Sequence, residues 1–113
     1  MEMVVRQWGV YRTLYSLPGI KVKELLVLPS KKLSMQKHYL RNEFWMVSEG
    51  IATVKRENGS YTVLDKHHHL FIKKQEWHQL SNETENDLRI VEIQYGDDCI
   101  ELDIERINYD SSK

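Results

Sequence analysis

The segment Ile51-Ala52-Thr53-Val54-Lys55-Arg56-Glu57-Asn58-Gly59-Ser60-Tyr61-Thr62-Val63-Leu64 predicts two short strands joined by a tight turn. Valine, isoleucine, threonine and tyrosine pack well on a pleated sheet, which favours strands on both sides of the turn. The pair Asn58-Gly59 supplies the positive φ values that a tight hairpin turn needs. We therefore expect an antiparallel β-hairpin here.

Short apolar segments separated by turns continue along the rest of the chain. Pro18-Gly19 and Pro29-Ser30 mark turns, and no amphipathic helix separates the segments. This pattern is typical of an all-β sandwich or barrel. Near the end, residues 97–106 have acidic residues first and apolar residues at helical spacing, which predicts one or two helical turns. The further expected strands are Val10–Tyr15, Val22–Leu28, Leu33–His38, Glu43–Val47, Leu70–Ile72, Trp77–Leu80 and Leu88–Tyr95.

Composition limits the classes of function. The chain has 113 residues, of which 41% are hydrophobic and 29% charged, so we expect a single domain over residues 1–113 with its own core. Sixteen basic and seventeen acidic residues give a net charge of −1, which argues against nucleic-acid and membrane partners. The sequence has no apolar run of membrane-spanning or signal-peptide length, and its single cysteine, Cys99, suits a reducing compartment. We expect a cytoplasmic protein.

Candidate metal ligands concentrate between residues 33 and 50. Side chains two apart in a strand share a face, so Gln36 and His38 point the same way, and a returning strand can bring Glu43 beside them. His78 begins a later strand that a barrel can bring across to them. Two imidazoles with two oxygen donors suit zinc or another divalent first-row ion. Each histidine taken alone is typical of a structural or surface residue, so the hypothesis depends on the spacing.

The spacing resembles the cupin pattern, with Gln36-x-His38, Glu43, Gly50 and a later His78-x-x-x-Asn82. More specifically, nearly the whole chain resembles the C-terminal cupin domain of type II mannose-6-phosphate isomerases, which are often fused to a mannose-1-phosphate guanylyltransferase. The matching blocks are Arg6-x-Trp8-Gly9-x-Tyr11, Lys21-Val22-Lys23, Leu33-Ser34-Met35-Gln36-x-His38-x-x-Arg41-x-Glu43-x-Trp45, Gly50-x-Ala52-x-Val54, Val91-Glu92-Ile93-Gln94 and Asp103-Ile104-x-Arg106.

The resemblance implies a single cupin barrel, that is, a double-stranded β-helix or jelly roll. It also implies one divalent metal ion, with zinc the first candidate and manganese, cobalt, nickel or iron the others. The ligands would be Gln36, His38, Glu43 and His78. Glutamine at the first ligand position is usual in the mannose-6-phosphate isomerase branch. Nothing in the chain resembles the glycine-rich nucleotide loop of the guanylyltransferase half.

The activity implied is interconversion of mannose 6-phosphate and fructose 6-phosphate through an enediolate. The metal would polarise the carbonyl as a Lewis acid, and a base would move a proton between C1 and C2. Lys23 and Glu92 are the candidate bases, because both lie in matching blocks on strands that can face the barrel interior. Arg106 in the C-terminal block is also expected to take part in activity.

A sugar phosphate needs fixed positive charge, which guanidinium groups supply best. We expect Arg41 and Arg106 to provide it at the barrel mouth, whereas Lys21 is equally well interpreted as a solvated surface cation. Trp45 shares the inward face of Glu43 and is a candidate for the pocket wall. Pairing of edge strands would give a homodimer.

Several positions depart from the family pattern. The usual Ile-Pro-x-Gly-x-x-His turn is Ile72-Lys73-Lys74-Gln75-Glu76-Trp77-His78, and the usual Pro-Gly is Pro29-Ser30. The family's Asp-x-Tyr-Gly-Arg tail is replaced by residues 109–113. These departures favour an alternative function, a non-catalytic cupin that binds a sugar or sugar phosphate. Consecutive residues in a strand point to opposite faces, so we do not expect His67-His68-His69 to serve one ion.

Overall fold

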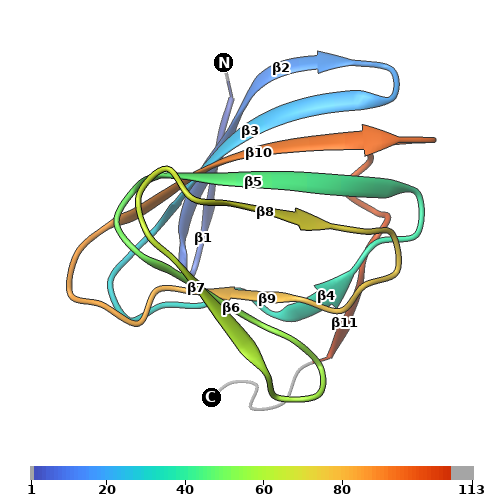
Figure 1. The fold of residues 1–113 in the computed structure, drawn as a ribbon. Helices are drawn as coiled ribbons and strands as arrows, with labels where there is room; N and C mark the ends of the chain where they lie inside the picture. Colours follow the sequence, from blue (N-terminus) through green and yellow to red (C-terminus); the bar gives the residue numbers. More distant parts are fainter. Residues whose placement is uncertain (1, 108–113) are drawn as a thin grey trace.

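A computed structural model describes residues 2–107, and every regular element in that range is a β-strand (Figure 1). No helix occurs within this part of the chain, and so none that could cross a membrane. The strands are β1 (Met3–Arg6), β2 (Gly9–Leu17), β3 (Ile20–Val27), β4 (Met35–Lys37), β5 (Arg41–Glu49), β6 (Ala52–Lys55), β7 (Tyr61–Leu64), β8 (His69–Ile72), β9 (Gln79–Ser81), β10 (Leu88–Gly96) and β11 (Glu105–Ile107).

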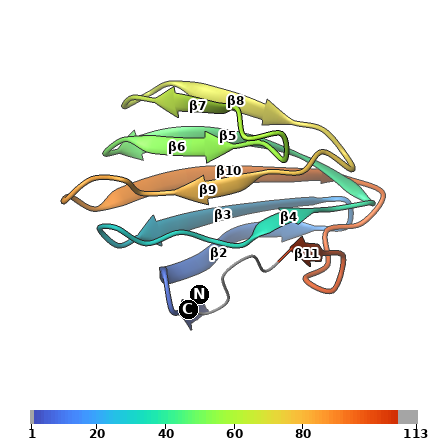
Figure 2. The same cartoon turned by 90° about the horizontal axis from the view of Figure 1, so that it is seen from below.

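The strands form two layers. Six of them make one antiparallel sheet in the order β1-β2-β3-β10-β5-β8. The short strands β7-β6-β9 and β11-β4 form the second layer, joined where Gln36 pairs with His78. This layer lies below the large sheet in Figure 1 and in front of it in Figure 2, so the two layers face each other. The predicted hairpin is confirmed as β6 and β7, with Lys55 opposite Tyr61.

The inward face changes character along the two central strands, β5 and β10. Alternation in a strand sends every second side chain into the barrel. The buried row is apolar towards one end, where it joins the hydrophobic core, and polar towards the other. Its members are Arg41, Glu43, Trp45 and Val47 on β5, and Leu88, Ile90, Glu92 and Gln94 on β10.

The helical turn predicted over residues 97–106 is absent. This segment contains turns and then β11, which pairs with β4 so that Arg106 lies opposite Gln36. The carboxylate of Asp103 accepts the backbone N–H groups of Tyr39 and Leu40, each at 2.9 Å. Because this acidic group binds a distant turn, it does not support a local helix. The segment that replaces the family tail, residues 109–113, lies outside the described residues.

Two turns keep a left-handed backbone although they lack the family glycine. Gln75 has φ 64° and Ser30 has φ 63°, a region that costs a residue with a Cβ roughly 1–2 kcal/mol. Contacts hold the first of these turns in place: the Gln75 N–H donates to the His38 carbonyl at 2.7 Å, and the Lys73 N–H donates to Glu76 Oε1 at 2.9 Å. The turn therefore still delivers the segment before β9 to the barrel interior.

Candidate metal centre and adjoining cavity

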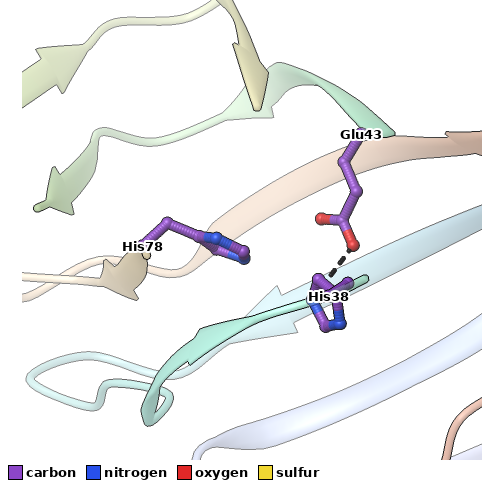
Figure 3. A group of neighbouring side chains, drawn as sticks. All are labelled: His38, Glu43 and His78. Carbon is purple, nitrogen blue, oxygen red and sulfur yellow. Dashed lines mark ion pairs between the residues drawn. The ribbon is translucent and has the colours of Figure 1, made fainter. Parts of the chain in front are cut away.

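Three of the four predicted ligands meet inside the barrel (Figure 3). His38 follows β4, Glu43 lies on β5 and His78 directly precedes β9. One nitrogen or oxygen of each residue lies within 4.8 Å of the others, and the three residues are only 4%, 1% and 2% exposed, respectively. The topology thus brings together donor atoms from three separate segments.

Both imidazoles are oriented by the backbone. His38 Nδ1 lies 2.7 Å from the Asp103 carbonyl oxygen, and His78 Nδ1 lies 2.8 Å from that of Glu76. A carbonyl only accepts, so each Nδ1 carries the hydrogen and each Nε2 keeps a lone pair for the cluster. Burial is the main cause that lowers the pKa of His38 to about 4, and burial also lowers the pKa of His78. Neutral rings held in this way are typical of metal-ligating histidines.

Glu43 is held equally firmly. Trp45 Nε1 donates to Glu43 Oε1 at 2.8 Å, which leaves Oε2 directed at His38 Nε2, 3.3 Å away. Two imidazoles and one carboxylate form a donor set that zinc uses at sites with an open position. The three side chains therefore fit a divalent first-row ion in donor type, protonation and spacing.

Arg41 lies against this cluster. It is the first residue of β5, points inward with Glu43 and is 6% exposed; the sequence prediction placed it at the barrel mouth. Its Nε donates to Glu43 Oε2 at 2.8 Å and its Nη2 lies 3.3 Å from His38 Nε2. The ion pair explains the burial, because a buried carboxylate is stabilised by an opposite charge with matching hydrogen bonds.

A cavity of about 420 Å³ shares Arg41 with the cluster. Five cations line it against two carboxylates, so its charge favours an anionic ligand. Trp8 and Tyr11 form an aromatic wall, with ring centroids 6.5 Å apart and planes inclined by 17°. The charged lining residues are Arg6, Lys23, Lys32, Arg41, Arg106, Glu92 and Glu101.

The two candidate bases line this cavity as cross-strand neighbours. Lys23 is 5% exposed, forms an ion pair with Glu101 and places its Nζ 4.3 Å from the centre of the Tyr11 ring. Glu92 accepts a hydrogen bond from Gln94 Nε2 at 2.9 Å. Burial, and then the charge of Glu43, raises the pKa of Glu92. Both residues are placed to exchange a proton with a ligand, and their role as bases stays a prediction.

The other predicted site residues occupy different surroundings. Gln36 lines the cavity, but its Nε2 donates to Ser34 Oγ at 3.2 Å, and its role as a ligand stays a prediction. Arg106 reaches the cavity from β11. Lys21 pairs with Glu101, with 3.6 Å between Nζ and Oε2. Trp45 is buried in the core at 3% exposure, where it orients Glu43 instead of walling the cavity.

Three residues of the site had no role in the sequence prediction. Asp103 orients His38 and the following turn, and Glu101 reaches into the cavity between lysines. Glu101 has no local signal, because its partners lie far away along the chain, whereas Asp103 lies in the matching block Asp103-Ile104-x-Arg106. Gln94 could have been found, because it lies two residues after Glu92 on the same face of a strand.

Two facing antiparallel β-layers with inward histidine and glutamate donors define a cupin, and comparison with solved structures agrees. A protein with a double-stranded β-helix domain from Klebsiella pneumoniae superposes with a TM-score of 0.75. The match covers 86% of this chain and 82% of that one at 15% sequence identity, so it establishes the fold. The predicted cupin barrel is confirmed.

The family is also established. The profile described as mannose-6-phosphate isomerase C-terminal matches residues 1–109, and the chain belongs to that family. A mannose-1-phosphate guanylyltransferase from Sinorhizobium fredii is 36% identical over 92% of this chain and 20% of its own length. The alginate biosynthesis protein AlgA of Pseudomonas aeruginosa is 34% identical over 92% of this chain and 21% of its own length. The chain therefore spans about a fifth of these relatives.

These comparisons correct the predicted function. Although the family description mentions an isomerase, the similar full-length proteins are named for guanylyl transfer on mannose 1-phosphate or for polysaccharide biosynthesis. The prediction of a mannose-6-phosphate isomerase is wrong, and the names give no better support to the alternative of a non-catalytic sugar-binding cupin. The relatives are enzymes in which a domain like this chain forms a minor part.

Proposed function

We propose that this barrel serves the mannose-1-phosphate guanylyltransferase family as a metal-dependent binding site for a phosphorylated mannose. The observation that carries the proposal is the buried group of His38, Glu43 and His78, joined through Arg41 to a cavity with an excess of cations. Zinc is the first candidate ion, because the donor set contains two neutral imidazoles and one carboxylate. The ion would supply Lewis-acid charge to a sugar oxygen.

Different side chains of the cavity can contact different parts of the ligand. Arg41 and Arg106 can hold the phosphate, because guanidinium groups match its oxygens with paired donors. Trp8 and Tyr11 offer a flat apolar wall to the carbon face of the sugar, as is common in ligand pockets. The buried carboxyl of Glu92 and the amide of Gln94 can hydrogen-bond hydroxyl groups.

The first test measures metal content and ligand binding on the whole chain. We expect one zinc ion per chain by elemental analysis, and calorimetric binding of mannose 1-phosphate that exceeds the binding of mannose and of inorganic phosphate. Glu43→Gln should abolish zinc binding, whereas Glu49→Gln, at an exposed position of the same strand, should not. The proposal would be overturned if Glu43→Gln still bound zinc, or if the zinc-loaded chain did not bind mannose 1-phosphate.

We also propose that the chain forms a homodimer through β1. This strand is an edge of the six-stranded sheet and exposes 58% of Met3 and 74% of Val5. An edge strand with apolar side chains is a template for pairing with a second strand. Light scattering should give twice the chain mass for the wild type and the single mass for Val5→Lys; a monomeric wild type contradicts the proposal.

A further inference from the structure

Two hydrogen-bond acceptors face each other inside the cluster. Glu43 Oε2 lies 3.3 Å from His38 Nε2, the contact marked in Figure 3. A carboxylate only accepts, and His38 Nε2 carries a lone pair because Nδ1 holds the ring hydrogen against the Asp103 carbonyl. Two acceptors this close repel each other unless a cation or a donor serves both.

Arg41 is the group that serves both acceptors. Its Nε lies 2.8 Å from Glu43 Oε2 and its Nη2 lies 3.3 Å from His38 Nε2, so one planar guanidinium spans the pair. Arginine has donors only and keeps its charge, so its contact with Nε2 requires the lone pair there. These two acceptor atoms are also the ones that would hold the metal. The guanidinium and the metal therefore compete for the same lone pairs.

We infer that Arg41 is an internal counter-ion that holds the donor atoms when metal is absent, releases His38 when metal binds, and then turns to the phosphate in the cavity. The inference rests on the proposed function and adds a regulation of the same site. Repulsion between a dication and a guanidinium a few ångströms apart drives the release.

The cavity provides a place for the released group. Arg41 already lines it, and its Nη1 is otherwise engaged with the Ile100 carbonyl at 3.2 Å. Lys23 and Arg106 on the same lining repel a further cation, and the lining carboxylate of Glu101 is already paired with lysines, so a bound anion stabilises the turned guanidinium. Metal binding therefore raises the affinity for phosphate, and phosphate raises the affinity for metal. The two affinities rise by the same factor because coupling between sites is reciprocal.

The decisive experiment compares Arg41→Gln with the wild type and with Arg106→Gln, which removes a cavity cation away from the donor atoms. Competition titration should show zinc binding about tenfold tighter in Arg41→Gln, within the range typical of coupled sites, and a much smaller gain in Arg106→Gln, which only reduces the repulsion on the released guanidinium. Calorimetry with mannose 1-phosphate should show about tenfold tighter binding after zinc loading of the wild type, and no such gain in Arg41→Gln. Arg106→Gln should weaken the sugar phosphate equally with and without zinc.

Further readouts separate the possible failures. If Arg41→Gln does not fold, Arg41→Lys keeps the charge but cannot span both acceptors, and its zinc affinity should exceed that of the wild type. The visible absorption spectrum of bound cobalt, compared between the wild type and the Arg41 variants, shows whether the same donor atoms hold the ion without any activity measurement. Unchanged or weaker zinc binding in the Arg41 variants overturns this inference alone. Absence of zinc binding by the wild type overturns the proposed function and this inference with it.

Discussion

The two ends of the barrel are built by the same strands and differ in what those strands place inside. At one end β5 and β10 contribute aliphatic side chains that are completely buried, such as Val47 and Ile90. At the other end they contribute Arg41, Glu43 and Glu92, which are also buried but carry ionisable groups. The two strands pair in one register from Ile90 opposite Val47 to Gly96 opposite Arg41, with a register shift between Arg89 and Ile90 at the apolar end, so the difference lies mainly in the side chains.

The apolar end of the barrel stabilises the fold, whereas the polar end carries the groups suited to binding a ligand. Burying apolar surface stabilises the fold, at about 25 cal/mol for each Å². Burying charged groups costs free energy, which ion pairs and hydrogen bonds such as those of Arg41 with Glu43 only offset. The polar end is therefore maintained at the expense of stability, as expected of a site that binds a ligand.

The largest effect on stability should come from the apolar end. Ile90 is 0% exposed within the core cluster, so Ile90→Ala should lower the free energy of unfolding by roughly 2–5 kcal/mol through lost burial and a residual cavity. Urea denaturation measures this change. Zinc affinity of the folded variant should equal that of the wild type, and a joint loss of both would contradict the separation of the two ends.

The polar end should make stability dependent on pH. Metal-free protein keeps His38 neutral because its pKa in the fold is about 4, below its ordinary value of 6.5. The unfolded chain takes up the proton first, so stability is fully present above pH 6.5 and falls as the pH approaches 4, by roughly 3 kcal/mol from this group. Urea denaturation with a chelator at several pH values measures the slope. His38→Gln should flatten that slope, whereas His67→Gln, at an exposed position, should leave it unchanged.

A buried polar residue away from the candidate metal ligands tests whether every buried polar side chain belongs to the binding site. Asn82 is 1% exposed, and its Nδ2 donates to the carbonyls of Val27 at 3.0 Å and Asn86 at 2.7 Å. Asn82→Ala leaves these carbonyls without their donor and should cost about 1–3 kcal/mol of stability. Calorimetry should show unchanged zinc binding, and weakened zinc binding would assign Asn82 to the site.

The smallest effect should come from the turn before His78, and it should be a gain. Gln75→Gly removes the cost of a left-handed backbone but adds freedom to the unfolded chain, so we expect stability to rise by at most ~1 kcal/mol. Thermal unfolding should detect the change. Gln75→Ala keeps the Cβ and should give no gain; an equal gain would show that the backbone conformation is not the cause.

Local sequence signals predicted most of the barrel. The hairpin at Asn58-Gly59 and the strand that contains Glu92 follow from turn residues and alternation. The spacing of His38, Glu43 and His78 matched the family pattern, and the structure brings these residues together. These features could be predicted because each depends on residues that are close in sequence or matched by the resemblance.

The errors have identifiable physical causes. The predicted strand began at Glu43, whereas β5 begins at Arg41, so the sequence pattern did not show that Arg41 is buried on the same inward face as Glu43. The predicted helical turn failed because Asp103 binds backbone groups more than sixty residues away. No short-range pattern reports such a contact. The predicted activity failed because a resemblance to one domain does not specify which reaction the family members are named for.

The contact between Asp103 and His38 also bears on how the molecule is made. The Asp103 carbonyl that orients the imidazole lies 65 residues later in the chain than His38. Proteins are synthesised from the N-terminus, and contacts of such long sequence separation form slowly because a large loop must first close. The Asp103 carbonyl can therefore orient the His38 ring only after residue 103 has emerged from the ribosome, so the folded barrel, and not the nascent polypeptide, presents the oriented Nε2.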